Sequence, residues 1–343
     1  MFYSVGVAIH ELLPKEEIKF DDLANKKIGI DAFNALYQFL SSIRGIDGTP
    51  LQDSHGRITS HLQGLFTRSV NLMGKGIKIA YIFDGHAPAL KLQEQQARNE
   101  RKLVAMEKYK EAEEEEDIEA MGKYAKQFVK LNADMIEESK ELVRALGLPC
   151  IEAPSEAEAQ GAFMCKQGDI YAVASQDSDA LLFGSPRLVR NLTLSQKRRL
   201  PSGSHVITFL EFIELKKVLD SLAIDHEQLI MMGILIGTDF NRGGIKGIGP
   251  KKALKLVQEY KGRYSEMFES LNPWFNWKDV YNVFKNIDTI SDYKLKWGPV
   301  DVAKVHEILV ERHEFSAERV QSILDKLQKE DKKKEQGDLA SFF

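Results

Sequence analysis

Hydrophobic residues in the first two hundred positions form short apolar runs, separated by longer stretches in which apolar residues recur with helical spacing. The apolar runs lie at 27–31, 77–84, 148–153, 170–176 and 188–193. Stretches of helical spacing lie at 32–44, 58–74, 134–146 and 155–167. Short apolar runs are typical of buried strands. The alternation therefore predicts an α/β fold with a mainly parallel central sheet and helices on both faces.

Two regions depart from this alternation. Residues 88–133 are highly charged, poor in strand formers, and contain the acidic run EAEEEED at 111–117. Composition favours a solvated helical hairpin or arm there, with a mobile helical lid over the sheet as the alternative. From about residue 222 the pattern is helical, and another helix is expected to start near Ser316. We expect an α/β core at 1–220, a helical region at 221–330 and a polar, flexible tail at 331–343.

Length and composition exclude several classes of protein. The 343 residues suffice for two domains of about 150 residues each, and 43% of them are hydrophobic. The two cysteines, Cys150 and Cys165, exclude a disulfide framework and indicate a reducing compartment. No apolar run is long enough to span a bilayer, and the N-terminus lacks the pattern of a secretory signal. The net charge of −4 at first disfavours a nucleic-acid partner.

Acidic residues follow the predicted strands. Asp31 and Asp84 end the first two apolar runs, and Asp177 and Asp179 follow the fourth. Each aspartate alone fits an ordinary turn residue. The carboxyl ends of parallel strands meet at one edge of a sheet, where ligands bind. We therefore expect these four carboxylates to converge.

Three further acidic residues join this group. Glu156 and Glu158 begin the helix after the third run, and Asp239 lies in the turn after GILIGT. Ser155 and Glu158 also fit a capping box, which is the alternative role for Glu158. Gathered carboxylates repel one another unless cations neutralise them, and an all-oxygen ligand set suits Mg²⁺ or Mn²⁺. Several carboxylates around two hard cations are typical of two-metal phosphoryl chemistry.

A glycine-rich segment at 243–252, GGIKGIGPKK, precedes an amphipathic helix. Glycines allow the backbone to approach a phosphate, and helix N-terminal N–H groups bind it. Pro250 suits the first helical turn. Residues 241–263 hold seven basic residues against one acidic residue. The segment resembles the helix–hairpin–helix element that grips duplex DNA without reading its sequence. The overall charge therefore averages an acidic centre with a basic surface and does not exclude DNA.

Several long motifs occur in a fixed order along the chain: IDAFNALYQFL, ITSHLQGLF, FDGHAPALK, APSEAEAQ, SQDSDALLFG, LVRNLT, GTDFNRGGIKGIGPKKA and QGDLASFF. With these motifs the chain resembles, almost end to end, flap endonucleases of the structure-specific 5′-nuclease family of archaeal and eukaryotic replication and repair. The resemblance implies a PIN-like core with a helical arch at 88–133. It also implies Mg²⁺-dependent hydrolysis at the junction of a 5′ flap and duplex DNA, with 5′–3′ exonuclease activity, in Okazaki fragment processing and base excision repair.

The resemblance assigns roles to individual residues. It implies that two Mg²⁺ ions, replaceable by Mn²⁺, are held by Asp31, Asp84, Glu156, Glu158, Asp177, Asp179 and Asp239. Lys91 and Arg98 would face the scissile phosphate and complete the catalytic set. The implied DNA contacts are Tyr37, Arg44, Thr59, Arg68, Arg190, Gly237, Gly247, Gly249, Lys251, Lys252 and Arg319, together with Glu156 and Asp239. Tyr37 would stack on a flap base, and Thr59 and Arg319 would line a pocket for a one-nucleotide 3′ flap. A monovalent cation at the 244–249 turn is also implied.

The last residues fit the box through which replication proteins bind the sliding clamp PCNA. Its positions are Gln336, Leu339, Phe342 and Phe343. Apolar groups on a polar tail have no core of their own and suit a pocket on a partner. We expect a monomer that binds branched DNA and the clamp, in the cytoplasm or nucleoid of an archaeon or the nucleus of a eukaryote. The family starts Met-Gly, whereas MFYSV precedes Gly6 here, so we expect Val5 to be the true start.

Three alternatives remain at this stage. A 5′-exonuclease or junction resolvase of the same family would share the carboxylates. A non-catalytic clamp-associated adaptor would use the glycine-rich segment and the tail, and would not need seven converging acids. A phosphatase would use Asp177 as a nucleophile, although no threonine follows in the usual place and the strand is not the first one.

Overall fold

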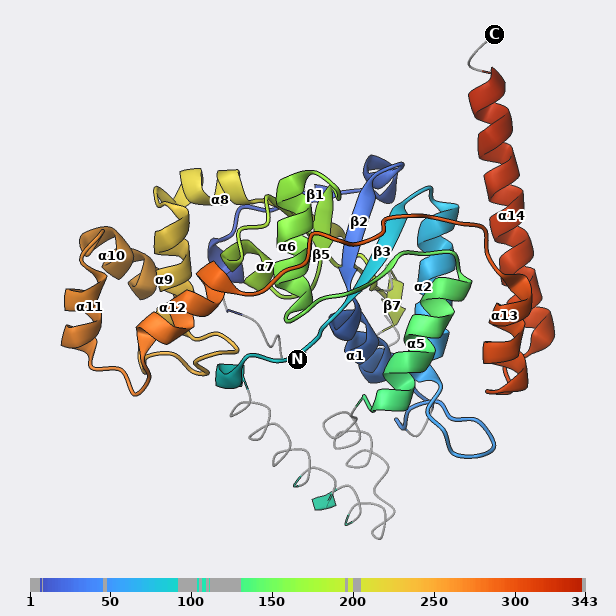
Figure 1. Ribbon diagram of the computed structural model, residues 1–343, viewed down its shortest axis with the longest axis horizontal. Helices are drawn as coiled ribbons and strands as arrows, with labels where there is room; N and C mark the ends of the chain where they lie inside the picture. Colours follow the sequence, from blue (N-terminus) through green and yellow to red (C-terminus); the bar gives the residue numbers. More distant parts are fainter. Residues whose placement is uncertain are drawn as a thin grey trace.

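A seven-stranded sheet with the strand order β1-β9-β6-β5-β2-β3-β4 forms the centre of the molecule (Figure 1). The computed structural model describes residues 7, 9–45, 48–91, 104, 107–108, 111, 131–194, 197–199 and 205–340. Within these ranges, only the backbone is described at 197–199, 205–207 and 331–340.

Five neighbouring strands of the sheet run parallel. They are β6 (Arg187–Arg190), β5 (Ala172–Ala174), β2 (Lys27–Asp31), β3 (Lys78–Phe83) and β4 (Cys150–Glu152). All five lie within the apolar runs of the sequence or within one residue of them. The prediction of a mainly parallel α/β sheet is confirmed.

The sequence did not reveal the remaining strands. β9 (Leu210–Glu214) runs antiparallel to β6, and β1 (Glu16–Ile18) pairs with β9 at the edge. A separate two-stranded ribbon consists of β7 (Lys197–Arg199) and β8 (His205–Ile207). These strands are short, and β1 is largely exposed and charged. They therefore do not show the continuous apolar pattern that identifies a buried strand.

Helices cover both faces of the sheet, each over its own hydrophobic core (Figure 1). α1 (Ala32–Ser42), α2 (Ser60–Gly74) and α5 (Ala133–Ala145) pack on one face. α6 (Ala157–Gln167), α7 (Asp179–Leu182), α8 (Leu215–Leu222) and α9 (His226–Ile236) contribute to the core on the other face. In β3, Ile82 lies in this second core, whereas its neighbours Tyr81 and Phe83 lie in the first. Both faces of the strand are buried, as a parallel sheet requires.

The first helices after α9 add to the second core, and the chain then crosses back to the first face. α10 (Pro250–Glu259), α11 (Tyr264–Leu271) and α12 (Trp277–Asn286) pack beside α9. An extended segment then crosses the molecule, and the indole of Trp297 donates a hydrogen bond to the Ile79 carbonyl (2.7 Å). α13 (Val302–His306), the π-helical turn η3 (Glu307–Glu311) and α14 (Ala317–Ala340) pack on the first face near α2 and α5. Short 3₁₀ helices, η1 (His10–Leu12) and η2 (Phe20–Leu23), flank β1.

The C-terminal end of the chain differs from the expected flexible tail. α14 starts near the predicted Ser316 and continues through Ala340, projecting from the body (Figure 1). Residues 330–336 are mostly Lys, Glu and Gln, which favour a helix, and the helix continues past Gly337, a poor helix former. Residues 341–343 lie outside the described residues.

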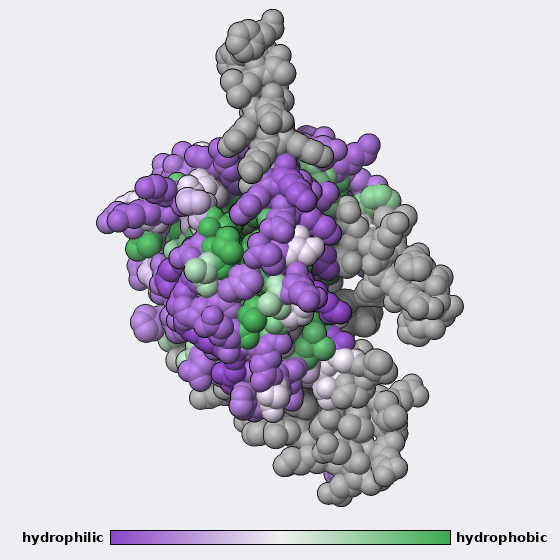
Figure 2. All heavy atoms as spheres, turned by 90° about the vertical axis from the view of Figure 1, so that its right-hand side faces the viewer, coloured by the Kyte–Doolittle hydropathy of each residue, from purple (hydrophilic) through white to green (hydrophobic). Residues whose placement is uncertain are grey.

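The side of the molecule formed by α13 and α14 is mostly hydrophilic, with hydrophobic residues scattered among polar ones (Figure 2). Among the described helices, none is both long and apolar enough to cross a membrane.

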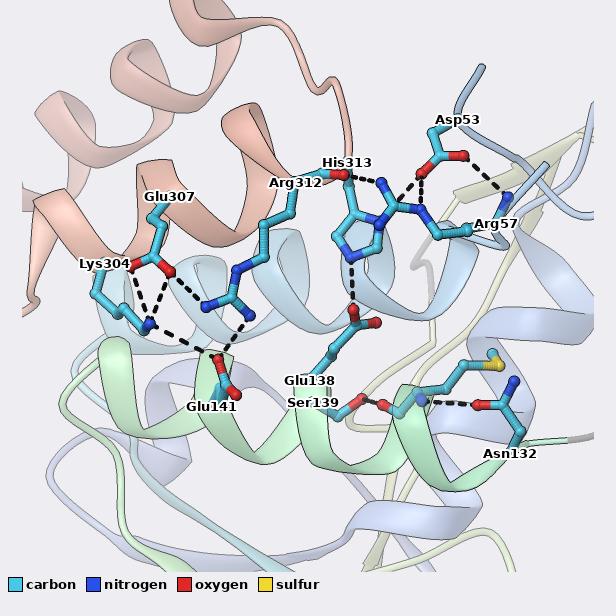
Figure 3. Close-up of polar contacts among 11 residues, drawn as sticks. Asp53, Arg57, Asn132, Glu138, Ser139, Glu141, Lys304, Glu307, Arg312 and His313 are labelled. Carbon is cyan, nitrogen blue, oxygen red and sulfur yellow. Dashed lines mark hydrogen bonds and ion pairs between the residues drawn. The ribbon is translucent and has the colours of Figure 1, made fainter. Parts of the chain in front are cut away.

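A buried polar network fastens the C-terminal segment to the first face (Figure 3). The His313 side chain is 1% exposed, and its ring nitrogens contact Glu138 of α5 (2.9 Å) and Asp53 (3.3 Å). Asp53 also pairs with Arg57 (2.7 Å). The ring of His313 thus bridges two acidic side chains that come from different segments of the chain. We call these residues, with Glu314, the His313 network.

Candidate active site

The carboxyl ends of the parallel strands bring the predicted acidic residues to one edge. Asp31 is the last residue of β2, and it pairs in register with Ile82, two residues before Asp84. β5 lies on the other side of β2 and leads into Asp177 and Asp179. The convergence of strand-end aspartates is therefore confirmed as an arrangement of the fold.

Hydrogen bonds hold the carboxylates of β2 and β5 in place. Asp31 caps α1 by accepting the backbone N–H of Asn34 (3.0 Å). The Asn34 side-chain amide donates to Asp177 (2.9 Å), and its oxygen accepts the N–H of Gln176 (3.3 Å). Asn34 thus spaces the two aspartates.

The helix after β4 is capped differently from the capping-box expectation. Glu156 is the N-cap residue of α6 and makes no side-chain cap. The Ser155 hydroxyl donates to the His86 carbonyl (3.1 Å), and Asp84 accepts the N–H of Ala157 (2.6 Å). Because Asp84, from the neighbouring strand, satisfies the helix N-terminus, Glu158 is free of the capping role and accepts from Ser175 (2.9 Å). The capping-box interpretation is wrong.

Two residues from distant parts of the chain complete this edge. The backbone N–H of Val7 donates to Asp179 (2.9 Å). Lys91 pairs with Glu156 (2.5 Å) and with Asp239 (3.5 Å), the residue in the turn after α9. We call the seven carboxylates and Lys91 the strand-end cluster.

Burial and mutual repulsion raise the pKa values in the strand-end cluster. Burial raises the pKa of Asp31 and of Glu158 well above their ordinary values, and neighbouring carboxylates raise them further. For the same reasons, the pKa of Glu156 rises to about 7 and that of Asp179 to about 8, although Lys91 opposes both shifts. Negative charge is thus held here at a cost that a cation would relieve.

Lys91 is the counter-ion that the structure provides. Burial alone would lower its pKa, but Glu156, Asp84 and Asp239 together raise the pKa above its ordinary value, so the ammonium stays charged. Within the described residues Lys91 is the one cation that pairs with this cluster, so ionisation of all seven carboxylates would leave the cluster strongly negative. The structure has Lys91 beside the carboxylates, and its expected role toward the scissile phosphate stays a prediction.

The donors fit hard divalent cations. All seven are carboxylates, and Mg²⁺ binds through one or two carboxylates while keeping several waters. Within the residues that the structure describes, no three His, Cys, Asp or Glu side chains form a ready-made ligand set for one ion. Such spacing agrees with binding partly through water.

Hydrogen bonds anchor two of the predicted DNA-contacting arginines. Arg190 donates to the Gln176 carbonyl (3.1 Å) and to Glu211 (2.7 Å). Arg44 donates to the carbonyls of Ser41 (3.1 Å) and Gly48 (2.6 Å). One further nitrogen of Arg44, Nη2, is buried and has no hydrogen-bond partner within the described residues. Burial lowers the pKa of Arg44, yet an arginine remains charged.

The other predicted contacts lie on α1, on α2 and at the start of α14. Tyr37 on α1 is 40% exposed, and Thr59 is the buried N-cap residue of α2. Arg68 lies on α2 and is half-buried, whereas Arg319 is exposed at the start of α14. These residues therefore belong to helices of the first face, and they are separate from the carboxylates of the strand-end cluster.

The glycine-rich segment forms the predicted turn and helix. α10 starts at Pro250 after the N-cap residue Gly249. Gly247 has φ +82°, and Gly237, at the end of α9, has φ +113°, both conformations that favour glycine. Gly249 has φ −96°, and a Cβ there would meet nothing within 4 Å. Since neither geometry nor internal packing requires glycine at 249, its missing side chain leaves the outer face of the helix N-terminus open. Lys251 and Lys252 are exposed beside it.

Several expected residues are not described at the side-chain level. Arg98, most of the 88–133 segment, Phe342 and Phe343 lie outside the described residues, as do residues 1–6 around the expected start. Gln336 and Leu339 lie in α14, where only the backbone is described. Their roles stay predictions.

Sequence reasoning missed the residues that hold the carboxylates. Asn34 and Ser175 make side-chain hydrogen bonds to acidic residues, and Val7 makes one from its backbone. Asn34 follows Asp31 by three residues at a helix start, a spacing that signals a cap and could have drawn attention to it. The Val7 contact spans 172 residues of sequence and has no local signal.

Comparisons with known proteins agree with this geometry. The XPG N-terminal domain model matches residues 9–105, and the XPG I-region model matches residues 147–239. Flap endonuclease 1 of Pyrococcus abyssi is 48% identical over 343 residues, covering 99% of this chain and 98% of that protein. This chain belongs to the flap endonuclease family. Members of this family are nucleases with divalent metal cofactors, which is the chemistry that the strand-end cluster fits.

Solved structures of the family share the fold. A flap endonuclease-1 from Methanococcus jannaschii is 40% identical, with a TM-score of 0.77 over 96% of this chain and 100% of that chain. The catalytic core of Rad2 in complex with DNA substrate is 22% identical, with a TM-score of 0.68 over 93% of this chain and 97% of that chain. The central sheet and flanking helices are therefore the architecture of the family.

Proposed function

We propose that this protein is a structure-specific 5′ flap endonuclease, with 5′–3′ exonuclease activity, that acts in DNA replication and base excision repair. The observation that carries the proposal is the strand-end cluster, in which seven carboxylates and one lysine share a sheet edge with raised pKa values. Whole-chain similarity to proteins named Flap endonuclease 1 supports the choice of substrate.

The cluster would hold two Mg²⁺ ions, or Mn²⁺ in their place, through its carboxylates. Bound divalent cations supply positive charge that activates water and stabilises the departing oxygen of a phosphodiester. Lys91 would present a positive charge to the scissile phosphate, where charge grows in the transition state. Arg98 is proposed to act beside it, from the 88–133 segment that we propose forms the arch.

The duplex would bind along the surface next to the cluster. The turn that starts at Asp239 leads into the open N-terminus of α10, which would hold backbone phosphates, with a monovalent cation at 244–249. The proposed contacts on the opposite side of the cluster are Tyr37, Arg44, Thr59, Arg68, Arg190 and Arg319. We retain the division into a core at 1–220, a helical region at 221–330 and a C-terminal part at 331–343 on these functional grounds.

The C-terminal residues are proposed to bind the sliding clamp. Gln336, Leu339, Phe342 and Phe343 have the spacing of the clamp-binding box, and α14 projects from the body ahead of them (Figure 1). We propose a monomer that meets the clamp and branched DNA where the chromosome is replicated.

The proposal is tested by cleavage of matched DNA substrates during a Mg²⁺ titration. A double-flap DNA with a one-nucleotide 3′ flap should be cut at the 5′ flap junction only with the metal, and faster than blunt duplex or a four-way junction. Removing residues 336–343 should leave this basal cleavage intact and abolish its stimulation by PCNA. Preference for the four-way junction would favour a resolvase, and flap binding without cleavage would favour the adaptor. Stimulation that survives the truncation would refute the tail assignment.

A further inference from the structure

The connection between α11 and α12 carries an unusually exposed tryptophan. Among the described residues, Trp274 has the largest exposed fraction of any large hydrophobic side chain, 67%. Its neighbours Phe275 and Trp277 are half-buried and pack against the second core. Exposed indole surface is a cost in water, so the position of Trp274 calls for a reason outside the packing of this chain.

Trp274 is held in place although its surface is open. Its indole Nε1–H donates to the Gly244 carbonyl (3.3 Å), and its ring meets Phe275 edge-on, with centroids 5.3 Å apart. A fixed ring that presents its apolar surface to solvent is the arrangement of a binding contact, because little side-chain entropy remains to be lost.

The turn that Trp274 contacts is rigid on its inner side. Asn241, 1% exposed, donates to the Ile234 carbonyl (2.7 Å) and accepts from the Thr238 hydroxyl (2.7 Å). The N–H of Ile245 donates to the Leu235 carbonyl (2.9 Å). The turn therefore has its own support from α9, and the outer hydrogen bond from Trp274 adds to it.

The same turn leads from the strand-end cluster to the proposed phosphate contact. Asp239 at its start pairs with Lys91, and Gly249 at its end opens the N-terminus of α10. Figure 1 shows this turn and the α11–α12 connection at the edge of the helical region nearest the carboxyl ends of the strands. Trp274 thus adjoins backbone that would lie against DNA.

We propose that the indole of Trp274 packs against a deoxyribose of duplex DNA, next to the phosphate held by residues 243–252. This proposal rests on the proposed function. The ring contacts Gly244, which belongs to residues 243–252, so the sugar that it meets would adjoin the phosphate held there. Lysines supply the charge for phosphates, and Trp274 supplies the uncharged surface that the sugar between them requires.

Salt dependence separates this contact from mere support of the turn. Each phosphate contact adds about 0.9 to the slope of log affinity against log salt, whereas an apolar contact adds nothing. Trp274→Ala should weaken binding to plain duplex in EDTA about tenfold, the scale of truncating an aromatic contact at an interface, and leave the slope unchanged. The control Lys252→Ala should lower the slope by about 0.9.

A conservative variant and tryptophan fluorescence complete the test. Trp274→Phe keeps an apolar ring but loses the hydrogen bond to Gly244, and it should retain most of the affinity. DNA should quench the emission of the unmodified protein and of the control Trp297→Phe, but not that of Trp274→Phe. A slope that falls in Trp274→Ala, or quenching that persists in Trp274→Phe, would overturn the proposal. Failure of the proposed function would appear separately, as absent flap cleavage by the unmodified protein.

Discussion

The strand-end cluster is a buried group of charged side chains, and the His313 network has a buried centre at His313 and Asp53, yet the pKa shifts in the two regions are opposite. At the strand ends, the pKa of Asp179 rises to about 8 and that of Glu156 to about 7. In the His313 network, burial alone would raise the pKa of Asp53, but hydrogen bonds from Arg57 and the contact with His313 lower it to about 2. The free-energy cost of burying charge is compensated by hydrogen bonds within the His313 network, whereas it is left uncompensated within the strand-end cluster.

The difference lies in the balance of donors and acceptors. In the His313 network, Asp53 meets Arg57 and His313, and Glu314 accepts both the N–H (2.7 Å) and the hydroxyl (2.5 Å) of Ser54. In the strand-end cluster, Lys91 is one cation facing seven carboxylates. A network that satisfies its own charges stabilises the fold, whereas unsatisfied charge marks a place where a ligand supplies the balance.

Neutralising one carboxylate of the strand-end cluster should have the largest effect on activity. Asp179→Asn keeps an oxygen that can accept the Val7 N–H, but it removes a charge that would hold the metal. We expect flap cleavage to fall at least about 10²- to 10³-fold, the scale of removing one electrostatic group from an active site. In EDTA at pH 7 the thermal midpoint should not fall, because the raised pKa of Asp179, about 8, leaves this carboxyl mostly neutral without metal and the amide is a neutral replacement.

The matched control is Asp220→Asn, which removes an exposed carboxylate on α8. It should leave both cleavage and thermal midpoint unchanged. If Asp179→Asn instead lowers the midpoint in EDTA by several degrees, the charge of Asp179 is stabilising, and the contrast with the His313 network fails.

Breaking the His313 network should chiefly affect stability. His313→Leu leaves Asp53 and Glu138 without their shared donor, and breaking a buried pair by removing one partner costs about 3 kcal/mol. Urea denaturation at pH 7 measures the free energy of unfolding. The control His55→Gln alters an exposed histidine 3.9 Å from Glu314 and should change stability by less than about 1 kcal/mol. Equal effects of the two variants would show that the buried contacts of His313 do not stabilise the fold.

The sequence predicted the strand-end cluster more completely than the His313 network, and geometry explains why. Asp31 and Asp84 directly follow apolar runs, so their side chains could be placed once the strands were recognised as parallel. His313 contacts Asp53 and Glu138 across 260 and 175 residues of sequence. No local pattern predicts which distant segments meet, so the network had to be seen in the structure.

Prediction of the strands likewise succeeded where the local sequence determines the strand and failed where distant contacts do. The buried strands β2, β3 and β5 are continuous apolar runs and were predicted. β9 mixes buried and half-buried residues without regular alternation, and its antiparallel pairing with β6 depends on tertiary contacts. The role of Glu158 was ambiguous for a related reason, because the competing acceptor for the N–H groups at the α6 N-terminus is Asp84, which follows another strand.

His61, beside the His313 network, offers the smallest and most specific test. His61 on α2 is fully buried, and neither ring nitrogen has a hydrogen-bond partner within the described residues. Burial first, and then the positive charge of nearby His313, lower its pKa from 6.5 to about 3. His61 is therefore neutral in the folded state, whereas the unfolded chain takes up a proton below about pH 6.5.

Stability should consequently fall as the pH decreases from 6.5 toward 3, by up to about 1.4 kcal/mol for each pH unit from this residue. His61→Leu removes that proton uptake, so its advantage in free energy of unfolding over the unmodified protein should grow between pH 6.5 and pH 5. Denaturation at a series of pH values measures this, and His55→Gln, at an exposed histidine, should show no such trend. A constant difference across the series would mean that His61 is protonated in the fold.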